Sequence, residues 1–151
     1  MKQAIFMVGA PNSGKSTYIN KNLYGLAIVS RDIKVLQLAG TDNYDDAWKK
    51  VDQKQVDKML QEHFEWVTES EQDFVIDMTN MSKKSRKRWL DKIDKSVYEI
   101  KAIVFRTPLE TLLYRNEQRP GKTIPVNVIH TMFNSYEEPT AEEGFSEIIY
   151  V

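Results

Sequence analysis

The sequence predicts an α/β fold with a mostly parallel, five-stranded sheet flanked by helices. Short, dense apolar runs alternate along the chain with segments of helical periodicity. The first run ends in a glycine-rich turn that leads directly into a helical segment. The chain has 151 residues, 41% hydrophobic and 28% charged, and no repeat or linker divides it, so we expect one domain over residues 1–151.

Five apolar runs are the strand candidates. Runs without polar alternation are typical of strands that are buried on both faces of a parallel sheet. In chain order they are residues 3–9 (QAIFMVG), 26–30 (LAIVS), 73–78 (DFVIDM), 98–106 (YEIKAIVFR) and 145–151 (FSEIIYV).

Helices are expected in the segments between these runs. Apolar residues recur at helical spacing from Trp48 to Val67, which predicts one long amphipathic helix. The three tryptophans are expected to pack in the core or between helices. The other helices are predicted at residues 15–22, 33–38, 83–95, 108–118 and 125–135, the last two opening with the Pro that a first helical turn tolerates.

Composition excludes several classes of protein. The absence of cysteine rules out disulfides, cysteine-bound zinc and a thiol nucleophile, and it favours the reducing cytoplasm. The N-terminal run is too short for a membrane span and continues into a structural motif, so we expect no signal peptide and no membrane association. A net charge of -1 argues against a protein that coats nucleic acid, but not against an enzyme that contacts a few nucleotides. A homo-oligomer is compatible with the sequence.

A phosphate-binding motif lies between the first strand and the first helix. Gly9-x-x-x-x-Gly14-Lys15-Ser16 fits the P-loop pattern in full, and this context is the one that the motif requires. Its backbone N–H groups would cradle triphosphate oxygens, Lys15 would reach the β- and γ-phosphates, and Ser16 would ligate Mg²⁺. At Asn12 we expect a left-handed backbone, which Asn tolerates better than other non-Gly residues. The predicted nucleotide-binding residues are Gly9, Asn12, Ser13, Gly14, Lys15, Ser16, Thr17, Arg115 and Arg119.

Two acidic residues follow strands at the edge of the sheet where α/β proteins bind ligands. Asp32 is either the N-cap of the next helix or the base that accepts a proton from an acceptor hydroxyl, and spacing does not choose between them. Asp77 ends the third strand as a Walker B carboxylate does, which favours an indirect role in holding Mg²⁺ over simple turn chemistry.

Arg115 and Arg119 share a helix face, and no acidic residue lies three or four positions from either. A bound polyanion would offset this repulsion, and Pro120-Gly121 followed by Lys122 suggests a lid over nucleotide phosphates, at about residues 115–125. The alternative is an exposed basic helix end that complements the helix dipole. We favour the lid.

Lys83 to Arg88 holds five basic residues in six, followed by Trp89. This cluster is either a nucleic-acid contact with Trp89 available for stacking, or a solvated helix with Trp89 turned inward. Neither histidine has the spacing of a metal ligand, and His63 is expected to be structural.

The segments GAPNSGKST, SRD, DMTN, RNEQRPGKTIP and EEPTAEEGFSEIIYV together resemble the kinase module of the polynucleotide 5'-hydroxyl kinases. That family includes phage end-healing enzymes, which repair nucleic acid, and the kinase half of animal polynucleotide kinase/phosphatases. The similarity runs in order over nearly the whole chain. It implies a P-loop kinase fold related to that of adenylate kinases, and transfer of the ATP γ-phosphate to the 5'-OH end of DNA or RNA.

Matched to the family motifs, Asp32 is implied as the general base, and Lys15 and Arg119 as catalytic groups on the transferred phosphoryl. Phage members often carry an Arg three residues after the base, where this chain has Val35, with Lys34 beside it. The Asp-x-Asp-x-Thr motif of the partner phosphatase domains is absent, so no 3'-phosphatase activity is expected. Two alternatives stay open: a small-metabolite or nucleotide-sugar kinase on this scaffold, and a P-loop switch that binds ATP.

Overall fold

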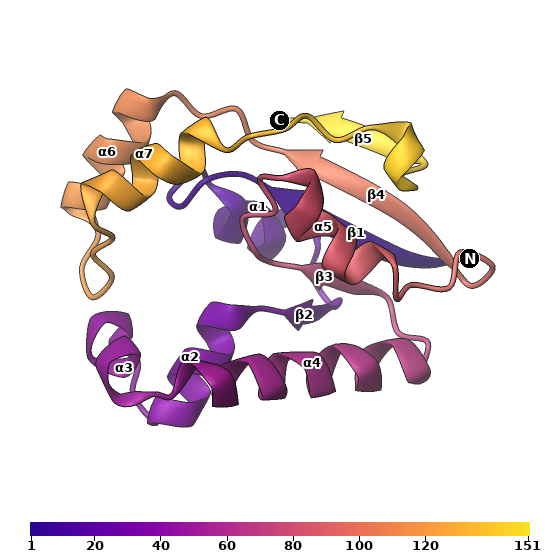
Figure 1. The fold of residues 1–151 in the computed structure, drawn as a ribbon, viewed down its shortest axis with the longest axis horizontal. Helices are drawn as coiled ribbons and strands as arrows, with labels where there is room; N and C mark the ends of the chain where they lie inside the picture. The colour runs from indigo at the N-terminus through magenta and orange to yellow at the C-terminus, as the bar shows by residue number, and fades with distance from the viewer.

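The computed structural model describes all 151 residues and confirms the α/β class (Figure 1). Its five strands form one sheet in the order β2-β3-β1-β4-β5, and every neighbouring pair is parallel. The sequence predicted a mostly parallel sheet, and the structure is parallel throughout. The strands are β1 (Lys2–Val8), β2 (Ala27–Val29), β3 (Phe74–Ile76), β4 (Tyr98–Val104) and β5 (Glu147–Tyr150).

The central strand β1 pairs on both sides, with Ile5 opposite Val75 of β3 and Lys101 of β4. Its last five residues are all buried, as its unbroken apolar run predicts. The observed strands β2 and β3 are shorter than their apolar runs. Ser30, for example, leaves β2 to cap the next helix.

Helices cover both faces of this sheet (Figure 1). Helix α1 lies behind β1, whereas α5 lies in front of it and α4 runs along the β2 side. None of the helices combines the length and apolar character needed to cross a bilayer. The helices are α1 (Lys15–Asn22), α2 (Arg31–Ala39), α3 (Tyr44–Lys50), α4 (Gln53–Glu69), α5 (Lys83–Leu90), α6 (Leu109–Gln118) and α7 (Val126–Asn134), with a 3-10 turn, η1 (Ala141–Glu143).

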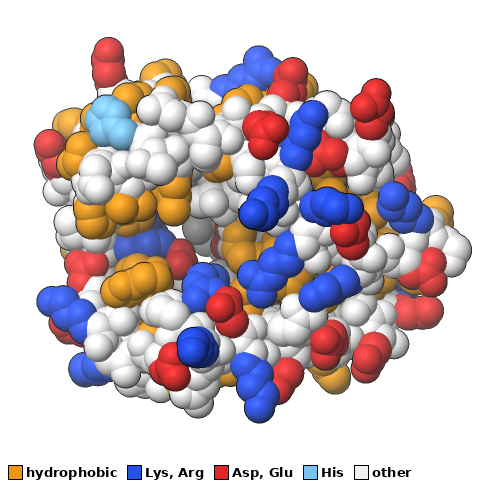
Figure 2. Space-filling model, in the orientation of Figure 1, with side chains coloured by type: hydrophobic (Ala, Val, Ile, Leu, Met, Phe, Trp, Pro, Cys, Tyr) orange, Lys and Arg blue, Asp and Glu red, His pale blue; other side chains and the backbone are white.

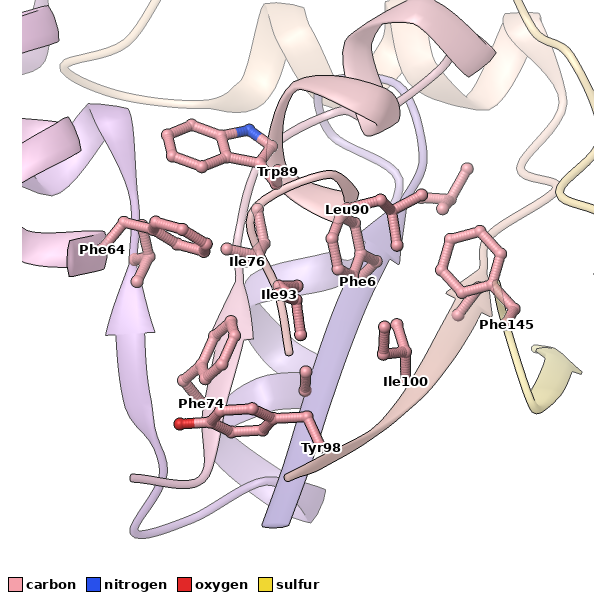
Figure 3. Close-up of a cluster of buried hydrophobic side chains, with 14 of the residues drawn as sticks. Phe6, Phe64, Phe74, Ile76, Trp89, Leu90, Ile93, Tyr98, Ile100 and Phe145 are labelled. Carbon is pink, nitrogen blue, oxygen red and sulfur yellow. The ribbon is translucent and has the colours of Figure 1, made fainter. Parts of the chain in front are cut away.

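The main core lies between the front face of the sheet and helices α4 and α5 (Figure 3). Phe64 of α4 is its aromatic centre, with ring centroids 5.9 Å from Phe74 and 4.9 Å from Trp89. Such pairs add about 0.5–1.5 kcal/mol each to the effect of burial. Trp89 is 2% exposed, which confirms its inward orientation and removes it as a stacking surface for nucleic acid.

The single long helix predicted from Trp48 to Val67 is wrong, because the chain forms two helices there. Helix α3 ends at Lys50, Val51 is extended, and the Asp52 side chain caps α4 by accepting a hydrogen bond from Lys54 N at 3.0 Å. Capping competes with helix continuation because it satisfies an N–H group that would otherwise lack a partner.

Two of the three tryptophans are exposed. Trp48 and Trp66 are 46% and 58% exposed, so the expectation that all three tryptophans pack inside is wrong for these two. Helical spacing alone did not distinguish the buried stripe of α4 from its flank. The helix predicted at residues 83–95 likewise ends earlier, at Leu90.

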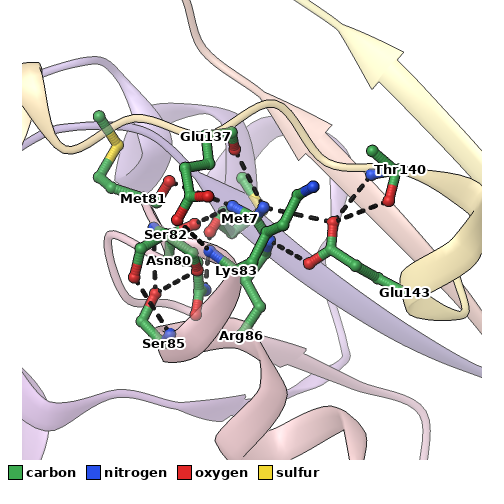
Figure 4. Close-up of polar contacts among 10 residues, drawn as sticks. All are labelled: Met7, Asn80, Met81, Ser82, Lys83, Ser85, Arg86, Glu137, Thr140 and Glu143. Carbon is green, nitrogen blue, oxygen red and sulfur yellow. Dashed lines mark hydrogen bonds and ion pairs between the residues drawn. The ribbon is translucent and has the colours of Figure 1, made fainter.

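Arg86 of α5 is fully buried and ties the C-terminal segment to the front of the sheet (Figure 4). Its guanidinium pairs with Glu143 of η1 at 2.9 Å and donates to the carbonyls of Asn80 at 2.8 Å and Glu137 at 2.9 Å. A buried cation with this many partners is a structural group. One residue of the basic cluster is therefore neither solvated nor available to a ligand.

Candidate functional site

The P-loop connects β1 to α1 at the carboxyl edge of the sheet. Asn12 has φ of 70°, which confirms the expected left-handed backbone, and Gly14 has φ of 105°. A Cβ at Gly9 would approach Ser13 Oγ to 2.5 Å, so that position needs glycine for close packing. Ser13 Oγ is buried without a hydrogen-bond partner. The motif therefore has the tight, positively polarised geometry that its pattern predicts.

Lys15 begins α1 and folds back over its own loop. Its ammonium donates hydrogen bonds to the carbonyls of Gly9 at 2.5 Å and Ala10 at 2.9 Å, and it forms no ion pair. Burial lowers the pKa of Lys15 to about 8, an effect that the nearby Asp77 carboxylate partly opposes. The cation is thus held by neutral partners that an anion can replace.

Asp77 follows β3 and lies at the bottom of the same site. Burial raises the pKa of its carboxyl group, and the Lys15 ammonium opposes this rise. Ser16 and Asp77 line one cavity of about 300 Å³. A hydroxyl and a carboxylate are hard oxygen ligands that suit Mg²⁺, which keeps several waters and binds substrate phosphates. No group of three acidic or histidine ligands exists in the protein, so a metal here would depend on the nucleotide.

Asp32 lies in the first turn of α2 and is not its N-cap. The cap is Ser30, whose side chain accepts a hydrogen bond from Ile33 N at 3.3 Å, so the capping alternative is wrong. The Asp32 carboxylate is about half exposed and forms an ion pair with Lys122. It lines the same cavity as Ser16 and Asp77. Its position is compatible with a group that meets an acceptor.

Arg115 and Arg119 both contact the P-loop at Asn12. Arg115 Nη1 donates to the carbonyl of Asn12 at 2.9 Å, and Arg119 Nη1 donates to Asn12 Oδ1 at 3.0 Å. Neither guanidinium forms an ion pair, as their isolation from acidic residues in the sequence predicts. The two positive charges therefore lie beside the phosphate cradle without a carboxylate partner.

The segment between α6 and α7 is docked against α3. The Asp45 carboxylate accepts from Thr123 N at 2.8 Å, and Asp45 N donates to the carbonyl of Gly121 at 3.0 Å. On the other side, the buried Asn116 donates to the carbonyl of Ile124 at 2.8 Å. Asp45 and Asn116 were missed by the sequence analysis, although Asn116 is a polar residue on the apolar face of α6, which is a detectable signal.

These elements enclose a cleft of about 1450 Å³ (Figure 2). It opens between the α6–α7 side and the α2–α3 side of the molecule (Figures 1 and 2). Of the predicted site residues, all but Gly9 line it: Asn12, Ser13, Gly14, Lys15, Ser16, Thr17, Asp32, Asp77, Arg115 and Arg119. Tyr44 and Trp48 of α3 also line the cleft and were not predicted as site residues.

The basic cluster of α5 lies outside this cleft. Lys83, Lys84, Lys87 and Arg88 are exposed, and Lys and Arg side chains gather over α5 in Figure 2. Lys87 pairs with Asp91 at 2.9 Å and Arg88 lies 3.9 Å from Asp57. With Arg86 and Trp89 buried, the structure favours the solvated-helix interpretation of this segment.

The comparison with protein families identifies the fold family. A model described as an AAA domain (AAA_33) matches residues 5–139. The chain belongs to this AAA-domain family. The match covers the P-loop, Asp32, Asp77 and residues 115–125, a frame that P-loop kinases use.

Individual similarities agree with the resemblance predicted from the sequence. The AAA domain is 26% identical over 153 residues to the bifunctional polynucleotide phosphatase/kinase of Schizosaccharomyces pombe, covering 97% of this chain and 33% of that protein. It is 25% identical to a chain in the solved Pnkp1/Rnl/Hen1 RNA repair complex, with a TM-score of 0.70, over 89% of this chain and 43% of the other. The chain thus spans about a third to less than half the length of these relatives.

The fold is also shared with kinases of small molecules. A gluconokinase from Sinorhizobium meliloti superposes with a TM-score of 0.58 at 15% identity, over 99% of this chain and 81% of the other. Such low identity shows the fold alone. Together the comparisons support a phosphotransferase of the P-loop kinase type that binds ATP.

Proposed function

We propose that this protein is a polynucleotide 5'-hydroxyl kinase that transfers the ATP γ-phosphate to the 5'-OH end of DNA or RNA. The observation that carries the proposal is the meeting of Asp32 with the P-loop lysine and the lid arginines around one cleft. The similarity to a polynucleotide phosphatase/kinase and to an RNA repair chain supports the choice of acceptor.

In the proposed reaction, the Asp32 carboxylate accepts the proton of the 5'-hydroxyl as its oxygen bonds to the γ-phosphorus. The bond from that phosphorus to the β–γ bridging oxygen breaks, and ADP leaves. Lys15 and Arg119 stabilise negative charge on the transferred group, and Arg115 helps to hold the phosphates. Lys122 pairs with Oδ2 of Asp32 in this structure, which leaves Oδ1 of the carboxylate as the oxygen that accepts the proton.

Magnesium has a place in this proposal beside the nucleotide. Ser16 would contribute its hydroxyl to the metal, and Asp77 would orient it or its water. When bound, the ion supplies charge neutralisation for the phosphate oxygens. The raised pKa of the Asp77 carboxyl is compatible with this role, because a dication would restore its ionised form.

A small-metabolite or nucleotide-sugar kinase is the second candidate. The gluconokinase shares the fold, and the cavity of about 300 Å³ beside Asp32 is large enough for a sugar acid. A P-loop switch that binds ATP without transferring phosphate is the third candidate. All three candidates bind ATP at the P-loop. The two kinases differ in the acceptor that reaches Asp32, and the switch has no acceptor.

Label transfer from γ-labelled ATP distinguishes these candidates. We expect wild-type protein to label a 5'-OH oligonucleotide and not gluconate, and Asp32→Asn to lose about 10²–10⁴-fold in kcat while keeping its ATP affinity. Labelling of gluconate alone would favour the second candidate. Bound ATP with no transfer to any acceptor would favour the switch. Undiminished transfer by Asp32→Asn would reject only the assigned base.

The same preparation tests two further parts of the proposal. DNA and RNA oligonucleotides of one sequence, compared as acceptors, identify the preferred polymer. Since the chain has no Asp-x-Asp-x-Thr segment, we expect no phosphate release from a 3'-phosphate oligonucleotide. Release at a rate comparable to kinase turnover would contradict this expectation.

A further inference from the structure

Trp48 is a large exposed aromatic residue in the wall of the cleft, and the reaction proposed above does not use it. It lies on α3, and its indole is 46% exposed. The ring of Tyr44 supports it from one side, at a centroid distance of 5.9 Å and an interplanar angle of 34°. By contrast, Trp66 on α4, which is 58% exposed, stacks on His63 and lies outside the cleft.

Tyr44 fixes the position of this aromatic pair relative to Asp32. Burial raises the pKa of Tyr44, and the neighbouring Asp32 carboxylate raises it further. The Lys122 ammonium, which pairs with Asp32, lies 4.5 Å from the centroid of the Tyr44 ring. Trp48 follows one helical turn later, about 6 Å along α3. Asp32 and Trp48 therefore line the same cleft and are linked through Lys122 and Tyr44, so an acceptor whose 5'-oxygen lies at Asp32 can extend along the wall that carries the indole.

The charges on this wall select the kind of ligand. Lys49 and Arg31 also line the cleft; Lys49 forms no ion pair, whereas Arg31 is paired with Asp57. Of the acidic residues that line this cleft, Asp32 pairs with Lys122 and Asp45 already accepts hydrogen bonds from Thr123 N. An aromatic face with adjacent cations suits a base joined to a phosphodiester, because the base stacks and the phosphate meets the cations. A sugar acid offers no π-face to Trp48.

We propose that Trp48 is the stacking platform for the 5'-terminal base of the acceptor strand. This inference rests on the proposed function and assigns the part of the acceptor that α3 contacts. It makes the base, in addition to the 5'-hydroxyl, a determinant of acceptor binding. The donor adenine is the other planar group in the reaction, and it provides the competing outcome in the test.

Steady-state kinetics on Trp48→Ala test the platform. We expect the KM for a 5'-OH oligonucleotide to rise about 5- to 150-fold, the range for loss of one base–aromatic stack, with the KM for ATP unchanged. Trp48→Phe should recover most of the affinity, since Phe keeps a stacking face. Trp66→Ala is the matched control for removing an exposed tryptophan and should change neither constant. A rise in the KM for ATP instead would overturn the proposal.

An abasic acceptor makes the test specific for the base. With a 5'-terminal abasic residue that keeps its 5'-OH, wild type and Trp48→Ala should have the same KM. An equal effect of the substitution on normal and abasic acceptors would reject stacking. If wild type phosphorylates no oligonucleotide, the proposed function fails. In that case, anisotropy of a labelled 5'-OH oligonucleotide still decides the platform, which is rejected if Trp48→Ala and Trp66→Ala bind it equally.

Discussion

Lys15 and Arg86 are both cations withdrawn from solvent near the carboxyl edge of the sheet, Arg86 fully and Lys15 in part, but their partners differ. Arg86 pairs with Glu143 and donates to three backbone carbonyls, so its charge is neutralised within the protein. Lys15 contacts only two carbonyls of its own loop, and burial lowers its pKa to about 8. Arg86, the structural cation, is therefore paired with a carboxylate. Lys15 has no carboxylate partner, so its charge is available to a bound anion.

The largest expected effect tests the functional cation. Lys15→Met should lower phosphate transfer by at least about 10³-fold, because the charge on the transferring phosphoryl loses a direct partner. The free energy of unfolding should stay the same or rise, since a partly buried, unpaired charge is removed. Label transfer and urea unfolding measure the two quantities. A marked loss of stability would mean that Lys15, like Arg86, is a structural cation.

The structural cation should show the opposite pattern. Arg86→Met leaves the largely buried Glu143 carboxylate without its cation, with only Thr140 still donating to it, and should lower the free energy of unfolding by about 3–5 kcal/mol. The double variant with Glu143→Leu should recover much of this loss, because no unpaired charge remains. Transfer by the folded protein should change little in either variant. Loss of transfer without loss of stability would contradict the assignment.

A pH profile sharpens the comparison. Lys15 is protonated below its pKa of about 8 in the free enzyme, so kcat/KM for ATP should fall about tenfold per pH unit above that value. Bound phosphates raise this pKa, so kcat at saturating ATP should hold to higher pH. Asp77→Asn removes a negative charge that favours the protonated form of Lys15. The decrease in kcat/KM with rising pH should therefore begin below pH 8 in this variant. A limb that stays near 10 would show that burial does not affect Lys15.

The smallest expected effect concerns the loop itself. Asn12 has positive φ and contacts Arg119 through its side chain. Asn12→Gly and Asn12→Ala both remove the side-chain contacts with Arg119 and Asn116, but only alanine keeps a Cβ on the left-handed backbone, so Asn12→Ala should be less stable than Asn12→Gly by about 1–2 kcal/mol. Thermal unfolding compares the two variants. Equal stability would mean that the loop relaxes to accept alanine.

Much of the fold could be predicted because its signals are local. The apolar run of β1 and the glycine-rich turn after it predicted a buried strand, a loop and a helix that begins at Lys15. The left-handed Asn12 followed from residue chemistry. The division of α3 from α4 was missed because the Asp52 cap is a short-range feature within a longer helical pattern. No pattern along the chain indicated that Arg86, which lies within a basic cluster, is buried and paired with Glu143, 57 positions later.

The candidate site, like the fold, could be predicted from the sequence only in part. Its residue types were predictable one by one, because each lies directly after a strand or in a recognised motif. Their joint placement, and the addition of Asp45, Tyr44 and Trp48 from α3, required the tertiary structure. Those residues act across the cleft, and no pattern along the chain brings them to Asp32.

The amino-acid sequence by itself determined the α/β class, the phosphate cradle and the isolation of Arg115 and Arg119 from acidic residues. These properties depend on neighbours a few positions apart. Only the tertiary structure decided that Lys15 has neutral partners and Arg86 an anionic one, that Lys122 pairs with Asp32, and that Trp48 lines the cleft. Burial and charge pairing are set by residues distant in the chain, so they exist only once the sheet and its helices have packed.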